Sequence, residues 1–305
     1  MAPVTFRLGT RGSPLALTQA GMVRDALCAA HGWRADEVGL VVVRTTGDRV
    51  QDRALAEIGG KALWTKELDR ALLAGDVDAC VHSMKDVETV RPDDIAIAAM
   101  LPRADVRDRL IGVASIAALP KGAVVGTSSP RRRAQLLRLR PDLAIVLFRG
   151  NVDTRLAKLA AGEADATLLA AAGLDRLGRA DIGAALPIDV MLPAPAQGAV
   201  GVEVRAVDAA ARDVVGAIDD SPTSRCVLAE RALLAALGAD CHSPVAALAE
   251  LTGGALRLRG EMLDADGTAH VAGSVEGQVP DVVGGALAAD LLARAPAVVR
   301  RLFAG

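Results

Sequence analysis

The stretch Leu8-Gly9-Thr10-Arg11-Gly12-Ser13-Pro14-Leu15 has a shorter counterpart later in the chain, Val125-Gly126-Thr127-Ser128-Ser129-Pro130. Both predict the end of a strand, a glycine turn, a serine N-cap and a proline at the first helical position. Such a turn directs backbone N–H groups and the positive end of the helix dipole to the space above a sheet, where open α/β sheets bind ligands. One copy alone is most simply the start of a helix. Because the motif occurs twice, with arginine beside each copy, we expect two lobes that face an anionic ligand.

Short apolar runs alternate with amphipathic segments over the first two thirds of the chain. The short runs predict strands, and apolar residues at three- and four-residue steps predict helices. This alternation predicts an α/β fold with largely parallel sheets. The predicted strands are Val4–Leu8, Val38–Val43, Asp78–His82, Ile95–Met100, Val124–Gly126, Ala144–Leu147 and Ala166–Ala170, and the predicted helices include Pro14–Ala30, Ala62–Ala74, Pro130–Arg138 and Val152–Ala161.

The last third of the chain has a different order of elements. Residues 188–201 break the periodicity and predict a segment that crosses between lobes, followed by a strand at Ala199–Val204. From Ser221 onward the pattern predicts a small α+β domain. Its elements are a helix at Pro222–Leu237, strands at Val245–Leu251, Leu256–Leu263 and Ala269–Val275, and a helix near Val282–Arg294.

Composition disfavours several classes of function. The chain has 305 residues, 51% of them hydrophobic, which suffices for a large core and about two domains or three small ones. A net charge of −2 gives no general attraction to nucleic acid or an anionic membrane, and an aromatic content of 2% leaves few side chains to stack on bases. No targeting or membrane segment is visible. Cysteines at positions 28, 80, 226 and 241 lack metal-site spacing, so we expect no metal and reduced thiols in the cytoplasm.

Arginine is concentrated between residues 131 and 155, where seven arginines face two aspartates, an excess of five positive charges. Arg131 and Arg132 begin one predicted helix, and Arg149 and Arg155 flank Asn151, the predicted N-cap of the next. Guanidinium groups at helix N-termini suit bidentate binding of carboxylates or phosphates. A solvated charged face is the plainer alternative, but at these four positions we favour a polyanionic ligand.

Lys85 and Asp86 follow a predicted strand in the run Cys80-Val81-His82-Ser83-Met84-Lys85-Asp86. Elsewhere such neighbours would be an ordinary surface ion pair. At the carboxyl edge of a strand, an acid among cations is a candidate for proton handling or for stabilising positive charge. We expect His82 to be a packed, hydrogen-bonded histidine.

Two loops complete the candidates. The run Gly59-Gly60-Lys61-Ala62-Leu63-Trp64 has the composition of a mobile flap with an aromatic tip, although a simple surface loop is the alternative. Cys241 lies in a predicted loop, where a thiol is available for covalent chemistry, whereas the other three cysteines lie in apolar contexts that predict burial.

Taken together, these motifs resemble the porphobilinogen deaminase family. The resemblance implies two lobes built like type II periplasmic binding proteins and a C-terminal α+β domain that carries the cofactor. The implied domains are residues 1–101 with 198–218, residues 102–197, and residues 219–305. Eight runs match in the family's order: Leu8–Gln19, Gly59–Leu68, His82–Val87, Gly126–Arg132, Arg149–Leu156, Ala170–Leu177, Pro195–Val202 and Leu237–Ala247.

The resemblance also implies a function. The family's enzymes are transferases of tetrapyrrole biosynthesis that join four porphobilinogen molecules head to tail into hydroxymethylbilane and release ammonia. A loop cysteine, matched by Cys241, forms a thioether to a dipyrromethane cofactor. The family's essential acid, matched by Asp86, lies beside pyrrole N–H groups and favours the positive charge that develops. Each pyrrole carries two carboxylates, which would account for the arginine excess.

Further site residues follow from the same matching. The implied catalytic residues are Asp86, Lys85 and Arg11. The implied cofactor-binding residues are Ser83, Lys85, Asp86, Thr127, Ser128, Ser129, Arg131, Arg132 and Arg155, and the substrate-binding residues are Arg11, Ser13, Gln19, Arg149, Gly150, Arg176 and Gln197. Lys61 and Trp64 fall on the family's active-site loop.

The chain departs from the family's usual pattern at a few positions. Trp64 replaces phenylalanine, Ala62 replaces glycine, Glu88 replaces proline, and Ala239-Asp240 replaces Gly-Gly before the cysteine. These departures affect the expected conformation of the loops rather than the chemistry.

We therefore expect a cytoplasmic, monomeric enzyme with porphobilinogen as substrate and with no nucleic-acid or membrane partner. The alternative is a non-catalytic, two-lobed anion-binding protein of the periplasmic type, in which Cys241 is incidental. The lack of a visible secretion signal and the presence of a third domain count against that alternative.

Overall fold

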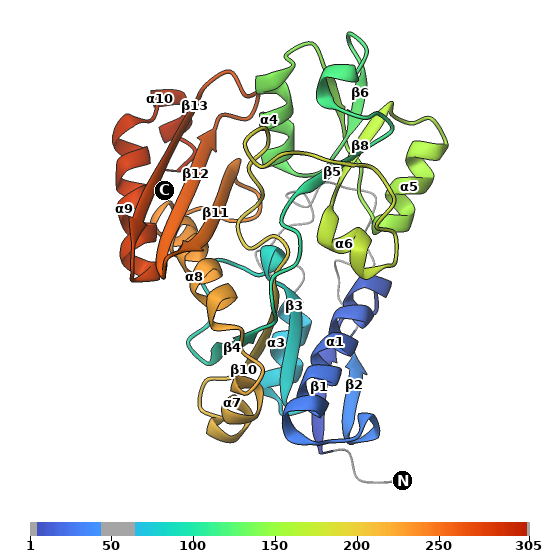
Figure 1. Cartoon of the computed structure of the whole chain (residues 1–305), viewed down its shortest axis with the longest axis vertical. Helices are drawn as coiled ribbons and strands as arrows, with labels where there is room; N and C mark the ends of the chain where they lie inside the picture. Colours follow the sequence, from blue (N-terminus) through green and yellow to red (C-terminus); the bar gives the residue numbers. More distant parts are fainter. Residues whose placement is uncertain (1–4, 44–64, 304–305) are drawn as a thin grey trace. The chain divides into compact units, whose positions relative to one another are not determined.

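The computed structural model describes residues 5–43 and 65–303, which form two compact units (Figure 1). Unit 1 contains the described residues within Met1–Gln51, Ile58–Ala104 and Gly198–Ser224, and unit 2 contains those within Asp105–Gln197 and Arg225–Gly305. The implied second lobe and the C-terminal domain thus fall within the same unit, and the division into three domains stays a prediction. The chain crosses from unit 1 to unit 2 after Ala104 and returns at Gly198.

Unit 1 is built on a five-stranded sheet in the order β2-β1-β3-β10-β4. The strand β1 pairs in parallel with β2 and β3, whereas β10 runs antiparallel to β3 and β4. The strands are β1 (Phe6–Thr10), β2 (Val38–Val42), β3 (Ala79–Ser83), β4 (Ile95–Met100) and β10 (Val200–Arg205), and the helices are α1 (Pro14–His31), α3 (Lys66–Leu73), α7 (Ala209–Gly216) and the short 3₁₀ turns η1 (Ala35–Glu37) and η3 (Met84–Asp86).

Unit 2 repeats this arrangement in a second five-stranded sheet, in the order β7-β6-β8-β5-β9. Here β6 pairs in parallel with β7 and β8, and β5 runs antiparallel to β8 and β9. The strands are β5 (Asp108–Ile111), β6 (Val124–Gly126), β7 (Ala144–Val146), β8 (Ala166–Ala170) and β9 (Ala184–Ala185), and the helices are the 3₁₀ turn η4 (Ile116–Ala118), α4 (Pro130–Leu139), α5 (Val152–Ala160) and α6 (Ala171–Arg176).

The expectation of largely parallel sheets holds for four strands of each sheet, which run in the same direction, and is wrong for the fifth, β10 or β5, which is antiparallel to both of its neighbours. The exceptions involve β5 and β10, which follow directly after the crossings at Ala104 and Gly198. A parallel pairing needs a crossover connection, usually a helix, that returns the chain to the same edge of the sheet. A strand that enters from the other unit has no such connection and enters its sheet in the antiparallel direction.

The two Ser-Pro turns adopt the predicted conformation. Pro14 begins α1, and the Ser13 side chain accepts a hydrogen bond from the Ala16 N–H at 3.3 Å. Pro130 begins α4, and the Ser129 side chain accepts from the N–H of Arg132 at 3.4 Å. Each turn follows the corresponding strand of its sheet, β1 or β6, which confirms the internal repeat.

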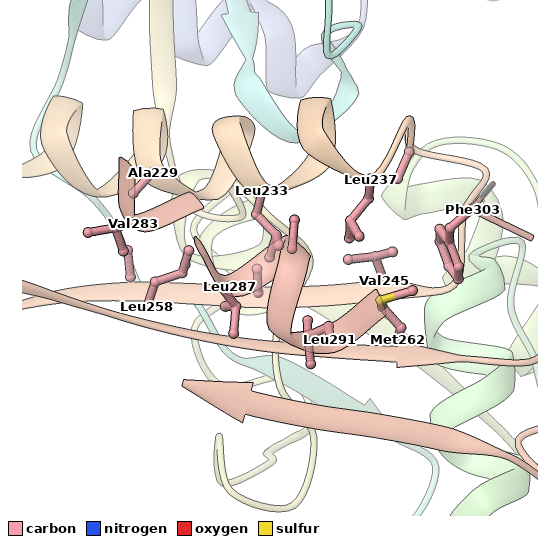
Figure 2. Packing of buried hydrophobic residues seen from close by; sticks show 14 of the residues in the cluster. Ala229, Leu233, Leu237, Val245, Leu258, Met262, Val283, Leu287, Leu291 and Phe303 are labelled. Carbon is pink, nitrogen blue, oxygen red and sulfur yellow. The ribbon is translucent and has the colours of Figure 1, made fainter. Parts of the chain in front are cut away.

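The C-terminal part of unit 2 contains the predicted α+β arrangement, a three-stranded antiparallel sheet with helices (Figure 1). Leu233, Leu287 and Leu291 are fully buried in one apolar core with Leu258 and Met262 of the sheet, as Figure 2 shows. Full burial of a leucine side chain stabilises a fold by about 1.5–3 kcal/mol. The elements are α8 (Ser221–Ala236), β11 (Val245–Thr252), β12 (Ala255–Leu263), β13 (His270–Gly277), α9 (Pro280–Arg294) and α10 (Ala297–Arg300).

No helix within the described residues is long and apolar enough to span a membrane.

The glycine that ends β6 is required by packing. A Cβ atom added to Gly126 would lie 2.4 Å from Cγ of Phe148, whose side chain is 1% exposed. By contrast, a Cβ atom added to Gly21 on α1 would have no neighbour within 4 Å.

We expect Gly126→Ala to lower the free energy of unfolding by about 1–3 kcal/mol, because the new methyl group overpacks the Phe148 ring. The matched change Gly21→Ala raises it by about 0.5–1 kcal/mol, because alanine is favoured over glycine within a helix. Urea denaturation of both variants at pH 7 measures these differences. Destabilisation of both proteins to the same extent would contradict this account of Gly126.

Candidate functional site

A cavity in unit 1 lies where β1 and β3 end. Five predicted site residues are among the described residues that line it: Arg11, Ser13, Gln19, Ser83 and Asp86. Because β1 and β3 are parallel neighbours, the loops that follow them meet at one edge of the sheet. Lys85 lies on η3 beside Asp86 but is not among the described residues that line the cavity.

A hydrogen bond joins the two sides of this cavity. Nε2 of Gln19, on α1, lies 2.9 Å from Oγ of Ser83, at the end of β3. Gln19 is buried, which means that its amide is held in a fixed position. The structure therefore brings together two residues that the sequence matched to substrate and cofactor binding.

Of the prediction that His82 is packed and hydrogen-bonded, the packing is confirmed. His82 is buried, and its Nε2 lies 3.2 Å from Oε2 of Glu203 on β10. Burial raises the pKa of Glu203, but His82 and Arg91 lower it by a larger amount, so that its pKa is about 2. Glu203 is therefore ionised at neutral pH.

The serine-rich turn of unit 2 is connected to the start of α5. Nε of Arg155 donates to the carbonyl oxygen of Gly150 at 3.0 Å, and its Nη2 donates to Oγ of Ser128 at 3.3 Å. The Thr127 hydroxyl accepts from the N–H of Ser129 at 3.2 Å. Five predicted cofactor- or substrate-binding residues thus belong to one local hydrogen-bonded group.

The backbone conformation at position 150 requires glycine. Its φ of 108° lies in the left-handed region, and an added Cβ atom would lie 2.6 Å from Cβ of Thr154. The family resemblance implied that Gly150 binds substrate. The backbone conformation gives a second reason for glycine at this position, because a side chain there would be strained.

Arg131 and Arg132 are buried and share a carboxylate that the sequence analysis did not identify. Nη2 of Arg131 and Nη2 of Arg132 each lie 2.7 Å from a different oxygen of Asp108 on β5. Gln197 joins them, because its Nε2 donates to Oδ1 of Asp108 at 2.9 Å. Burial raises the pKa of Asp108, but the two guanidinium groups lower it more strongly and hold it well below its usual range.

Asp108 therefore organises three of the predicted site residues. A signal for it was present in the sequence, since an acidic residue stands at the beginning of the short apolar run Leu110–Ile111. An acid buried beside a strand needs a cationic partner. Sequence alone did not indicate which arginines would reach it.

The remaining predicted cations also lie in unit 2. Arg149 is buried in the loop after β7, and Arg176 ends α6 and is partly exposed. Burial lowers the pKa of Arg176, although the neighbouring Asp175 opposes this change.

Cys241 is exposed, in a tight loop between α8 and β11. Asp240 organises this loop: its Oδ1 accepts from the N–H of His242 at 2.8 Å, and its N–H donates to Oγ of Ser243 at 3.1 Å. Asp240, which stands where the family usually has glycine, thus holds the loop through these hydrogen bonds.

The other cysteines are less accessible. Cys80 and Cys226 are buried and Cys28 is partly exposed, and within the described residues none of the cysteines forms a disulfide. Burial raises the pKa of the Cys80 thiol far above its usual value, so it is a poor nucleophile at neutral pH. Lys61 and Trp64 lie outside the described residues.

Two family descriptions match the chain. "Porphobilinogen deaminase, dipyromethane cofactor binding domain" matches residues 6–213, and "Porphobilinogen deaminase, C-terminal domain" matches residues 224–293. The chain belongs to the porphobilinogen deaminase family.

Curated relatives agree with this assignment. A porphobilinogen deaminase of Sphingopyxis alaskensis is 60% identical over 305 residues, covering 98% of this chain and 96% of the relative. Another, of Paracoccus denitrificans, is 54% identical over 298 residues, covering 96% of this chain and 95% of the relative.

Solved structures similar to the chain include periplasmic binding proteins. An ABC transporter periplasmic substrate-binding protein of Coxiella burnetii is 16% identical, with a TM-score of 0.42, and the match covers 74% of this chain and 94% of that chain. A periplasmic binding protein of Salmonella typhimurium is 13% identical, with a TM-score of 0.40, over 72% of this chain and 93% of that chain.

We expect Asp108→Asn to lower the free energy of unfolding at pH 7 by about 3–5 kcal/mol, because it leaves two buried guanidinium groups without their shared carboxylate. The folded-state pKa of Asp108 lies below the unfolded value of about 3.9, so its stabilisation is complete above that pH and is lost as the pH falls below it. The difference between the two proteins should therefore shrink in acid.

Urea denaturation at pH 7 and at pH 3.5 measures both effects. Asp266→Asn is the matched control. Asp266 forms an exposed ion pair with Arg133, which lies on α4 beside Arg131 and Arg132, so this change should alter stability little. A difference between wild type and Asp108→Asn that does not depend on pH would refute the assigned charge pairing.

Proposed function

We propose that this protein carries out the reaction of its family with Cys241 as the site of cofactor attachment and Asp86 as the acid beside the reacting pyrroles. Members of the family are transferases of tetrapyrrole biosynthesis that polymerise four porphobilinogen molecules into hydroxymethylbilane with release of ammonia. The observation that carries the proposal is the exposed thiol of Cys241 in a chain whose residues 6–213 match a dipyrromethane-binding domain.

The residues of unit 2 fit a dipyrromethane with its carboxylate side chains. Arg131 and Arg132 each have a buried Nε atom with no hydrogen-bond partner among the described residues, and they follow Thr127, Ser128 and Ser129 directly in the sequence after Pro130. Guanidinium and hydroxyl donors at the start of a helix suit carboxylates. When bound, the cofactor supplies the pyrrole carbon to which the first substrate is joined.

The residues of unit 1 are assigned to the reacting groups. Asp86 lines the cavity with Arg11 and Ser13. A carboxylate there stabilises positive charge on a pyrrole nitrogen, and the Arg11 guanidinium and the Ser13 hydroxyl suit a substrate carboxylate. We assign Lys85 to the same site because it follows the same strand.

A cytoplasmic monomer with no nucleic-acid or membrane partner remains part of this proposal, supported by the composition. The alternative of a non-catalytic anion-binding protein is not favoured, because two enzyme-family descriptions and curated enzymes match nearly the whole chain.

The attachment site is tested by Cys241→Ala. We expect a folded or partly folded protein without the added mass of two pyrrole units and without activity, since only a thiolate forms the thioether. Intact-protein mass spectrometry and assays with porphobilinogen provide the measurements. Cys28→Ala, at the partly exposed cysteine of α1, should keep the adduct. Adduct or normal activity in Cys241→Ala would overturn the assignment.

The arginines are expected to act at different stages. If Arg131, Arg132 and Arg155 hold cofactor carboxylates, replacing each with leucine impairs the assembly of holoenzyme. If Arg11, Arg149 and Arg176 bind incoming substrate and the growing pyrrole chain, their variants carry the cofactor but stop with one or more pyrroles added.

The physical reason is that each condensation adds two carboxylates to a finite set of cations. Intact mass after brief exposure to porphobilinogen resolves the enzyme-bound intermediates. Because Arg131 and Arg132 also pair with Asp108, the folded fraction of each of their variants is measured in parallel by circular dichroism. An identical loss of all species in the six variants would argue against separate stages.

A further inference from the structure

The turn that carries Lys85 and Asp86 is flanked by two residues that contact the same buried carboxylate. On the preceding side, Nε2 of His82 lies 3.2 Å from Oε2 of Glu203. On the following side, Arg91 donates from Nε to Oε1 of Glu203 at 2.8 Å and from Nη2 to Oε2 at 2.9 Å. Glu203 lies on β10 and is fully buried. Both ends of the segment that contains Asp86 are thus tied to one strand.

Arg91 binds two further carboxylates. Its Nη2 lies 2.6 Å from Oδ1 of Asp69 on α3, and its Nη1 lies 2.7 Å from Oε2 of Glu88. The Arg91 side chain is only 8% exposed. Burial lowers its pKa, but the carboxylates of Glu203 and Asp69 raise it more, so Arg91 stays charged. One guanidinium group therefore links helix α3, strand β10 and the turn after β3.

Glu88 connects Arg91 to the cavity itself. The hydroxyl of Thr65 donates to the Glu88 carboxylate, with 2.8 Å to each oxygen. Thr65 is 1% exposed and lines the same cavity as Asp86. Glu88 thus lies two residues after Asp86 and binds both a cavity-lining residue and the buried arginine.

The charges of this cluster make Glu88 the residue to change. Three carboxylates, those of Asp69, Glu88 and Glu203, surround one guanidinium group. Burial raises the pKa of Asp69, and the charge of Glu203 raises it further, although Arg91 opposes both effects. Because Arg91 keeps its ion pairs with Asp69 and Glu203 when position 88 is a neutral glutamine, the buried guanidinium group stays paired and the protein should fold.

We propose that Glu88 and Arg91 are positioning residues that hold Asp86 and Thr65 at the cavity. The inference rests on the proposed role of Asp86. Proline, usual in the family where Glu88 stands, restricts the backbone through its ring. In this chain the restriction comes from hydrogen bonds of a side chain, which places Glu88 and Arg91 in the machinery that orients the acid.

The test compares Glu88→Gln and Thr65→Val with wild type. We expect kcat for porphobilinogen to fall about tenfold or more, because small displacements of an orienting group are costly. KM should stay within about twofold, and intact mass should show full cofactor loading. Thr65→Ser keeps the hydroxyl and should restore kcat, which distinguishes the hydrogen bond from a general packing defect.

Asp208→Asn is the matched control. Asp208 lies after β10 and forms an ion pair with Arg205, the last residue of that strand, and asparagine keeps a side chain that can cap α7. This variant should have wild-type kcat.

A double-mutant cycle separates this inference from the proposed function. Asp86→Asn alone should lower kcat by about 10²–10³-fold, as expected for loss of one preorganised electrostatic group. If Glu88 acts through Asp86, adding Glu88→Gln to Asp86→Asn lowers kcat no further. Additive losses, or wild-type kcat in both Glu88→Gln and Thr65→Val beside a defective Asp86→Asn, would overturn the positioning role alone. Full turnover of Asp86→Asn would overturn the role of Asp86 and this inference with it.

Discussion

The pairing of buried carboxylates with arginine is the interaction on which candidate site residues of each unit depend. An isolated charge cannot be kept in a protein interior, because the loss of hydration costs far more than other interactions supply. Asp108 therefore holds Arg131 and Arg132 in fixed positions, and Glu203 holds Arg91 and contacts His82. In unit 2 the pair includes two predicted ligand-binding residues, Arg131 and Arg132, and in unit 1 it lies on both sides of the turn that carries Asp86.

The two buried acids lie on equivalent strands of the repeated sheets, at different positions along those strands. Asp108 lies on β5 and Glu203 on β10, the antiparallel strands that follow the crossings at Ala104 and Gly198. The buried acid nevertheless contacts different kinds of residue in the two units. In unit 2 the buried acid orients cations suited to carboxylates, whereas in unit 1 the cluster supports the turn that ends in Asp86. A shared framework thus carries the acid in one unit and most of the arginines in the other.

A second buried acid links the crossing segment to the C-terminal sheet within unit 2. Glu230 on α8 accepts the N–H of Ala196 at 2.5 Å and the N–H of Ala249 at 2.7 Å. Ala196 has a positive φ of 60°, which is costly for a residue with a side chain, and the hydrogen bond helps to offset that cost. The next residue, Gln197, contacts Asp108. The domain that bears Cys241 is therefore connected to the buried carboxylate by a short series of hydrogen bonds.

Local chemistry determined much of this protein. Ser13-Pro14 and Ser129-Pro130 begin helices because capping and the fixed φ of proline act over neighbouring residues, and the loop position of Cys241 follows from the end of one helix and the start of a strand. These features need no distant partner. The same is true of the family resemblance, which rests on short runs in a given order.

Only the tertiary structure decided the direction of β5 and β10 and the partners of the buried charges. The sequence pattern of a short strand is the same in a parallel and an antiparallel pairing, so it contains no information about direction. Asp108 and Glu203 are separated along the chain from the arginines that they bind, and their low pKa values depend on cationic partners that only the assembled sheets bring to them. Sequence could therefore predict which arginines belong to the candidate site, but it could not show which acids hold them in place.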